Sequence, residues 1–318
     1  MSSLVKQKIG IPKRKYKGLE RSGSWVLYLF LAPAIVLTIL FGYLTFFSIP
    51  IAFMDYNIFA GWFGLGSPWV GFRHFQAFLA DRWFWELAGR TVLYSFMGIV
   101  IGFPASLILA LLFNELKNAT FRKTVQTISY VPNFVSWVTV AGLVYLFLSV
   151  EPTGLINNIV TAITGGDRVS YMMHSEYFLL VLLITGVWKS VGWGTIMYMA
   201  AISGIDQQLY EAADIDGAGR FKKALHITMP GLMPIFCILL IFAMGSLFSV
   251  SFDQVFNLEN QVIRERVQTI DFFTYQRGVV GGRYSQAAAV GLFQSAVSFL
   301  LVITVNKVAR KVSDTGIF

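Results

Sequence analysis

The chain has 318 residues, of which 56% are hydrophobic and only 13% carry a charge. Soluble domains usually have about 25% charged residues, so an ordinary water-exposed surface is excluded and lipid is expected to face much of this chain. The formal net charge is +8, and the single cysteine, Cys237, rules out a disulfide within the chain.

Long stretches without Asp, Glu, Lys or Arg mark candidate transmembrane helices, which need about 20 mostly apolar residues. Six are found, and only the fourth contains a charge, Lys189. The first is too long for the apolar region of a signal peptide. The sequence therefore predicts an all-α polytopic membrane protein with about six transmembrane helices. They are Trp25–Ile49, Thr91–Phe113, Thr124–Val150, Tyr177–Ile205, Ile227–Phe252 and Tyr284–Asn306.

The loops between these spans divide the basic residues unevenly. Sixteen Lys and Arg lie on the side of the N-terminus and eight on the opposite side. Cytoplasmic loops are enriched in Lys and Arg, so both termini are predicted to be cytoplasmic. Residues 1–24 then form a basic cytoplasmic tail that rests on membrane lipid rather than binding nucleic acid, and residues 25–318 form the transmembrane domain.

The sequence lacks the residue groups that enzymes and metal sites require. His74, His174 and His226 stand apart from cysteines and acids at ligand spacing. There is no HExxH, no GxSxG and no GxxxxGK[ST] motif for binding nucleotide phosphates. We therefore expect no catalytic residue, no metal site and no cofactor in this chain.

Lys189 is a charge in the middle of a predicted span. An ammonium in hydrocarbon costs roughly 2.5–3.5 kcal/mol on insertion scales, so it is expected to face a partner or a water-filled cavity. Either it lines a polar pathway, or it forms a structural ion pair or reaches the membrane surface. Trp188 and Trp193 flank it.

The cytoplasmic segment 206–230 predicts two short helices joined at an elbow. Asp206 is a suitable N-cap, and Gly217 and Gly219 end the first helix. A second helix, Arg220 to Ile227, leads into the fifth span. Such a compact helical knob fits a groove in a partner, while the alternative is an amphipathic loop on the membrane surface.

This segment also resembles a known motif. Glu211-Ala212-Ala213, three residues, Gly217, nine residues, Ile227, one residue and Met229-Pro230 are similar to the EAA motif of permease subunits in binding-protein-dependent ABC importers. The one departure is Met229, where leucine is usual. Further resemblance to oligosaccharide importers, including those for alginate fragments, lies in residues 51–59, 252–258, 270–271 and 284–293.

The resemblance implies a type I ABC importer permease of the maltose-type subgroup in the bacterial cytoplasmic membrane. It implies a second, related but non-identical permease, two copies of an ATP-binding subunit that holds ATP and Mg²⁺, and a solute-binding protein. It also implies that the residues matching the motif and their neighbours couple this chain to the ATPase. These residues are Glu211, Ala212, Ala213, Asp216, Gly217, Arg220 and Pro230.

Aromatic and polar residues near the fourth and fifth spans are the candidates for the substrate pathway. A cation there, together with Arg264, Arg266, Arg277 and Arg283 outside, suits an anionic, uronate-containing sugar. The predicted pathway residues are Lys189, Trp188, Trp193, Asp253, Gln254 and Tyr275.

Two other functions are compatible with a polytopic membrane protein. An ion-coupled secondary transporter usually has carboxylates within its spans, and none of the six spans contains one. A membrane-embedded glycan or lipid-linked sugar transferase needs acidic clusters at the surface. Glu211, Asp214 and Asp216 form one, but the EAA spacing accounts for them.

Overall fold

The computed structural model describes residues 24–43, 46, 48–60, 64, 66–249 and 252–313. These residues form helices joined by turns, with one isolated bridge between Met54 and Trp69 and no sheet in the described ranges. The all-α prediction is confirmed. The predicted basic tail, apart from Ser24, lies outside the described residues. The chain divides into two compact units, Met1–Ile51 and Ala52–Phe318.

The first unit contains one apolar helical segment. α1 (Ser24–Thr38) continues into a π-helical turn, Ile39–Tyr43, and α2 (Ser48–Ile51) follows. Its large apolar side chains are mostly exposed, which suits a helix surrounded by lipid. The unbroken apolar helix, Leu27–Tyr43, is shorter than the predicted span Trp25–Ile49.

Four helices of the second unit are long and apolar enough to cross a membrane. They contain most of the second, fourth, fifth and sixth predicted spans. α4 begins well before Thr91 because the Asp81 carboxylate caps it, accepting a hydrogen bond from the Trp83 N–H at 2.9 Å. The helices are α4 (Arg82–Asn114), α8 (Ser175–Ser203), the continuous helix Arg220–Gly245 that includes α10 (Arg220–Lys223) and α11 (Met229–Gly245), and α15 (Tyr284–Ser313).

The predicted third span, Thr124–Val150, is not one continuous helix but a bent pair of helices. Its two parts are bent by 96°. Pro132 has no N–H to continue the helix, and Ser136 starts a new one by accepting a hydrogen bond from the Thr139 N–H at 3.2 Å. The described residues thus hold four spans, or five if this pair is one, where about six were predicted for the chain. The parts are α5 (Ala119–Tyr130), a 3₁₀ turn (Val131–Phe134) and α6 (Trp137–Phe147).

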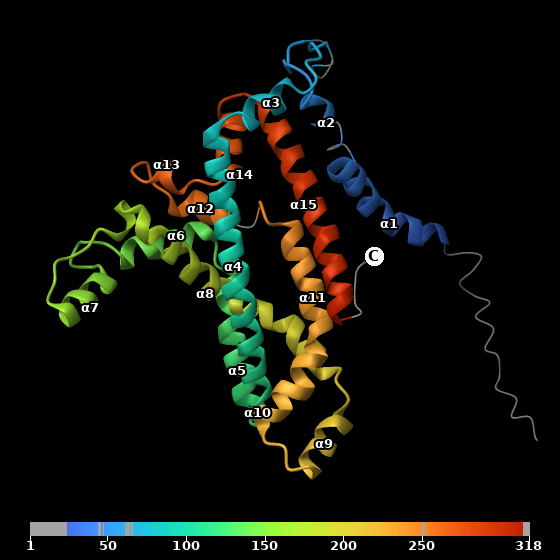
Figure 1. The fold of residues 1–318 in the computed structure, drawn as a ribbon, viewed down its shortest axis with the longest axis vertical. Coiled ribbons are helices and arrows are strands. Elements are labelled where there is room, and N and C mark those ends of the chain that lie inside the picture. Colours follow the sequence, from blue (N-terminus) through green and yellow to red (C-terminus); the bar gives the residue numbers. More distant parts are fainter. Residues whose placement is uncertain are drawn as a thin grey trace, which may run out of the picture. The chain divides into compact units, whose positions relative to one another are not determined.

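The segments predicted as outer loops are largely helical. Figure 1 shows α3 at one end of the second unit and α9 (Gln207–Ile215) at the opposite end. The segments of α3 and α9, which were predicted to lie on opposite sides of a membrane, are therefore well separated along the second unit. The outer helices are α3 (Arg73–Leu79), α7 (Leu155–Thr164), a 3₁₀ turn (Tyr171–Met173), α12 (Phe252–Leu258), α13 (Arg264–Val267), α14 (Ile270–Tyr275) and a π-helical turn (Gln276–Val280).

Glycines allow α8 to pack closely against two other helices. A Cβ added to Gly192 would overlap the carbonyl oxygen of Ser129 in α5. A Cβ on Gly194 would crowd the side chain of Ser106 in α4. These two positions need glycine because a neighbouring helix occupies the space of a side chain.

A buried apolar cluster fixes the outer half of α8 to α4 and α12. Tyr94, Phe178, Leu182, Val255 and Leu258 are each at most 5% exposed and pack together. This cluster holds α12 against the rest of the second unit, so the residues of α12 have a defined place beside α8.

Candidate coupling and pathway sites

The segment of residues 206–230, here called the coupling elbow, has the local structure that the sequence predicts. The Asp206 carboxylate caps α9, accepting a hydrogen bond from the Gln208 N–H at 2.9 Å. After α9 the chain turns at Gly217, whose φ of +71° is strained for any residue with a Cβ. The Ala218 N–H donates back to the last turn of α9 at 2.8 Å, as in a glycine-terminated helix.

Three side-chain contacts stabilise the elbow: one joins it to Glu115 at the end of α4, and the other two lie within it. Two are ion pairs with at least one exposed partner, each worth about 0–1 kcal/mol. The third reaches the buried hydroxyl of Thr228. None of these contacts was predicted from the sequence. They join Lys223 Nζ to Asp214 Oδ1 at 2.7 Å, Arg220 Nε to Glu115 Oε2 at 3.7 Å, and Tyr210 Oη to Thr228 Oγ1 at 2.9 Å.

The predicted coupling residues lie mostly on the outside of this elbow. Glu211, Ala212, Asp216, Gly217, Arg220 and Pro230 are exposed, and Ala213 is partly exposed. The Glu211 side chain makes no hydrogen bond or ion pair with another described residue. Its carboxylate is therefore available to a group from outside the chain.

Three large apolar side chains of the coupling elbow are also exposed. Ile215 is 88% exposed, Phe221 81% and Leu209 53%. None of the three was predicted as a coupling residue, although Ile215 lies two residues before Gly217 and Phe221 two residues after Gly219. Large apolar side chains that are exposed beside a polar motif are typical of a surface that binds a partner.

Lys189 lies in α8 and contacts the break between α5 and α6. Its ammonium donates to the carbonyl oxygens of Asn133 and Val135, both at 2.6 Å, with the Pro132 carbonyl at 3.4 Å. The ring of Trp137 lies 5.5 Å from the same nitrogen. A broken helix leaves carbonyls without N–H partners, and one ammonium has three protons to donate to them.

The two tryptophans predicted for the pathway are both about half exposed. Trp188 is 45% exposed and Trp193 is 48% exposed. The Trp193 ring meets Phe134 edge to face, with centroids 5.6 Å apart. Trp193 therefore contacts the same helix break that Lys189 holds, and both tryptophans remain about half exposed.

The three remaining predicted pathway residues are in different surroundings. Gln254 is only 6% exposed, and its amide donates to the Leu182 carbonyl at 2.7 Å and the Thr185 hydroxyl at 2.9 Å. It thereby fastens α12 to α8. Asp253 is exposed, and Tyr275 packs edge to face on the aromatic rings of α12.

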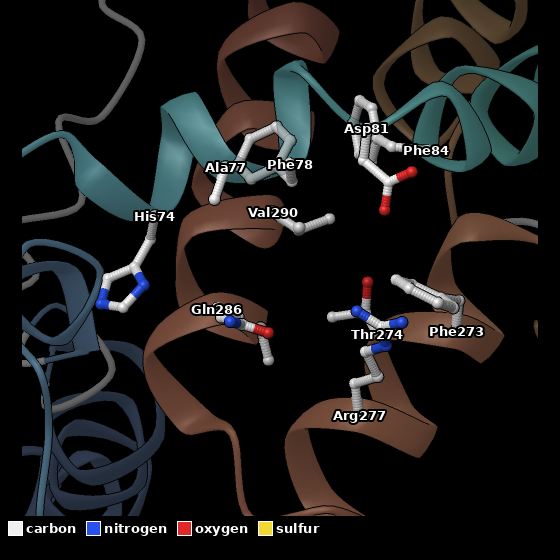
Figure 2. Close-up of a pocket in the computed structure, with 11 residues that line it drawn as sticks. His74, Ala77, Phe78, Asp81, Phe84, Phe273, Thr274, Arg277, Gln286 and Val290 are labelled. Atoms are coloured by element: carbon white, nitrogen blue, oxygen red, sulfur yellow. The ribbon is translucent and has the colours of Figure 1, made fainter.

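A small cavity of about 80 Å³ lies among α3, α4, α15 and the segment after α14. Figure 2 shows His74, Asp81 and Arg277 around it. Each of these has a local role: His74 Nε2 is 3.0 Å from a backbone carbonyl, Asp81 caps α4, and Arg277 lies 4.5 Å from the centroid of Phe273. Arg277, one of the four arginines predicted to suit an anionic sugar, is thus at the outer end.

In the part of the chain that the structure describes, no three His, Cys, Asp or Glu residues gather in a group that could hold a metal ion. The chemistry of the sites is instead that of hydrogen bonds, aromatic faces and apolar docking surface. The long apolar helices and the exposed coupling elbow together define a polytopic α-helical membrane protein.

The chain belongs to the family described as binding-protein-dependent transport system inner membrane component, whose model matches residues 98–314. The matched range includes the coupling elbow and, in whole or in part, five of the six predicted transmembrane spans.

Relatives of known name match nearly the whole chain. Protein LplB of Bacillus subtilis (strain 168) is 38% identical, over 97% of this chain and 99% of its own length. The polygalacturonan/rhamnogalacturonan transport system permease protein YteP of the same organism is also 38% identical, over 96% of this chain and 94% of its own.

Two solved structures have the same fold. One is a chain of a bacterial ABC transporter that imports the acidic polysaccharide alginate; it is 34% identical, with a TM-score of 0.82, over 95% of this chain and all of that one. The other is a chain of a bacterial alginate ABC transporter in complex with a periplasmic protein bound to an alginate pentasaccharide. It is also 34% identical, with a TM-score of 0.83, over 96% of this chain and all of that one.

Proposed function

We propose that this chain is the permease subunit of an ATP-driven importer and forms the pathway for an oligosaccharide that contains sugar acids. The observation that carries the proposal is the near full-length similarity, at 34–38% identity, to permeases named for polygalacturonan and alginate transport. Alginate is named as an acidic polysaccharide and polygalacturonan is by its name a polymer of galacturonic acid, so a uronate-containing substrate fits both.

The motor is a separate chain in this proposal. The sequence has no phosphate-binding loop, so two copies of an ATP-binding subunit would hold ATP and Mg²⁺. Each ATPase would receive one elbow: Ile215 and Phe221 supply apolar contact area, and Glu211 supplies a charge for a basic residue. A second, related permease would complete the pathway, and a solute-binding protein would deliver the sugar.

The orientation of the chain in the membrane is part of this proposal. With sixteen Lys and Arg on the side of the elbow and eight opposite, the elbow and both termini lie in the cytoplasm. The outer helices α3, α12, α13 and α14 then face the solute-binding protein. Residues 1–24 bind the lipid surface.

Within the pathway, the predicted residues divide into two roles. Trp188, Trp193, Asp253 and Tyr275 offer aromatic faces and polar edges to a sugar. Lys189 and Gln254 act as positioning residues, because their polar atoms already bind backbone carbonyls of neighbouring segments. They hold the helix break and α12 where the contacting side chains need them.

The test is uptake into proteoliposomes that contain both permeases and the ATPase, with loaded solute-binding protein outside. We expect accumulation of a labelled uronate oligosaccharide that requires ATP inside and exceeds the accumulation of a neutral oligosaccharide of equal length. Uptake driven by an ion gradient without ATP, or sugar transfer to lipid, would contradict the proposal and favour the two other classes of membrane protein.

A further inference from the structure

A hollow of about 520 Å³ is lined by residues of α14, of α15 and of the segment at the end of α11. None of the predicted pathway residues lines it. It is large enough for a small organic ligand, since such sites usually measure about 300–1,000 Å³. Its lining residues are Gly245, Phe248, Ser249, Asp271, Gly291, Gln294, Ser295, Ser298, Phe299 and Val302.

One face of α15 contributes a polar row to this hollow. Gln294, Ser295 and Ser298 stand at helical spacing, so their side chains share one side of the helix, one turn after Gly291. The rest of α15 in this region is apolar. A polar face on a membrane helix is costly toward lipid and is expected to border water or a polar ligand.

Opposite this row stands a carboxylate that already binds it. The Gln294 amide donates to Asp271 Oδ1 at 2.7 Å, and Gln294 is only 8% exposed. α14 holds Asp271 in place because the Ile270 N–H donates to the hydroxyl of Thr91 in α4 at 2.9 Å. The pair is therefore pre-arranged, with a carboxylate oxygen and an amide oxygen left as acceptors at the hollow.

The chemistry of the lining selects a saccharide. Paired carboxylate and amide groups accept hydrogen bonds from neighbouring hydroxyls, and serine hydroxyls both donate and accept. Phe248 and Phe299 border the same space with apolar rings, which suit the C–H face of a sugar ring. A metal ion is disfavoured because Asp271 is the only carboxylate among the lining residues.

We propose that this hollow, built on Asp271, Gln294 and Ser298, is a saccharide site at the outer part of the translocation pathway, which binds the ring hydroxyls of the transported oligosaccharide. The proposal rests on the function proposed above. The acidic groups of the sugar would point away from Asp271. The pKa of Asp271 is raised, because the effect of burial exceeds the opposing effect of the hydrogen bond from Gln294. A carboxyl group that holds its proton more readily repels a uronate less.

The test uses the assembled importer in proteoliposomes. Gln294→Leu keeps the size of the side chain and removes the amide, and Asp271→Asn removes the carboxylate. We expect each to lower uptake at least tenfold, while ATP hydrolysis stimulated by the loaded solute-binding protein stays within about twofold of wild type. Thr304→Val is the matched control, because Thr304 is exposed on α15 and its hydroxyl bonds within the helix; its uptake should not change.

A labelling experiment tests the same site if Gln294→Leu or Asp271→Asn fails to assemble. Ser298→Cys is introduced together with Cys237→Ala, which removes the only native thiol. A membrane-impermeant thiol reagent added outside should label Ser298→Cys, and a uronate oligosaccharide with its binding protein should slow that labelling at least threefold. Absence of labelling, or labelling that the sugar does not change, would overturn the site.

The two proposals fail in different ways. If the wild-type importer takes up no saccharide at all, the proposed function is wrong. If the wild type transports and Gln294→Leu and Asp271→Asn transport equally well, only the saccharide site is wrong.

Discussion

Two bends between helices in the described part of the chain, the coupling elbow and the break between α5 and α6, are stabilised in opposite ways. The coupling elbow is local: Gly217 supplies the turn, and the contacts around it are exposed ion pairs and one hydroxyl pair. The bend between α5 and α6 depends on Lys189, which lies more than fifty residues further along the chain and binds the carbonyls of the break. A bend that depends on a local glycine and exposed contacts can change its geometry when a partner binds. A bend whose carbonyls are bound by a residue of another helix is fixed within the helical bundle.

The strongest effect is expected from removing that cation. Lys189→Met keeps the length of the side chain but leaves the Asn133 and Val135 carbonyls without their donor. Each charge-assisted hydrogen bond is worth about 1.5–3 kcal/mol, so the loss should lower the midpoint of thermal unfolding in detergent by several degrees. Ser190→Ala, which removes only a bond within α8, is the control and should leave the midpoint nearly unchanged. Equal stability of both variants would show that Lys189 does not hold the bend.

The next largest effect is expected from a substitution that disturbs the close packing of α8 on α5. Gly192→Ala places a methyl group where the Ser129 carbonyl lies, and overpacking of this kind costs roughly 1–3 kcal/mol. Gly98→Ala in α4 is the matched control, because nothing lies within 4 Å of its added Cβ. We expect a lower unfolding midpoint for Gly192→Ala alone, measured in the same detergent. A destabilised Gly98→Ala would mean that the loss comes from helix glycines in general.

A smaller loss of stability, with a larger loss of function, is expected at the elbow. Gly217→Ala forces a residue with a Cβ into the left-handed region, at a cost of about 1–2 kcal/mol. Gly219→Ala has an ordinary φ of −67° and open space, so it is the control. ATP-dependent uptake should fall in Gly217→Ala and persist in Gly219→Ala. Unchanged uptake in both would remove the elbow geometry from the coupling step.

The smallest effect is expected from the exposed ion pair that braces the elbow. Asp214→Asn breaks the contact with Lys223, and such pairs contribute about 0–1 kcal/mol. The unfolding midpoint should fall by no more than about 2 °C, and the difference from wild type should shrink in high salt because exposed charges are screened. A loss as large as that of Lys189→Met would contradict the contrast between the two bends.

Local patterns predicted the helices and the elbow well. Apolar runs are long enough to specify α4, α8, α11 and α15, and Asp206 and Gly217 mark their own turns. The break at Pro132 was not predicted, because the apolar run continues unbroken through it in the sequence. Only the 96° bend shows that the run is two helices rather than one.

The predicted sites were limited by contacts between distant residues. A charge within a span signals that Lys189 needs partners, but the sequence does not show that those partners are backbone carbonyls of another helix. The Gln294–Asp271 pair was missed for the same reason, since it joins α15 to α14 across a turn of the chain. Exposure of Ile215 and Phe221 likewise depends on how the elbow folds.

The central claim is that a separate ATPase covers the elbow, and cross-linking tests it most directly. A photoreactive amino acid replaces Ile215, which is 88% exposed, in the complete importer within native membranes. The account predicts a cross-link to the ATP-binding subunit that disappears when that subunit is omitted. A cross-link to lipid alone, or none when all subunits are present, would contradict it.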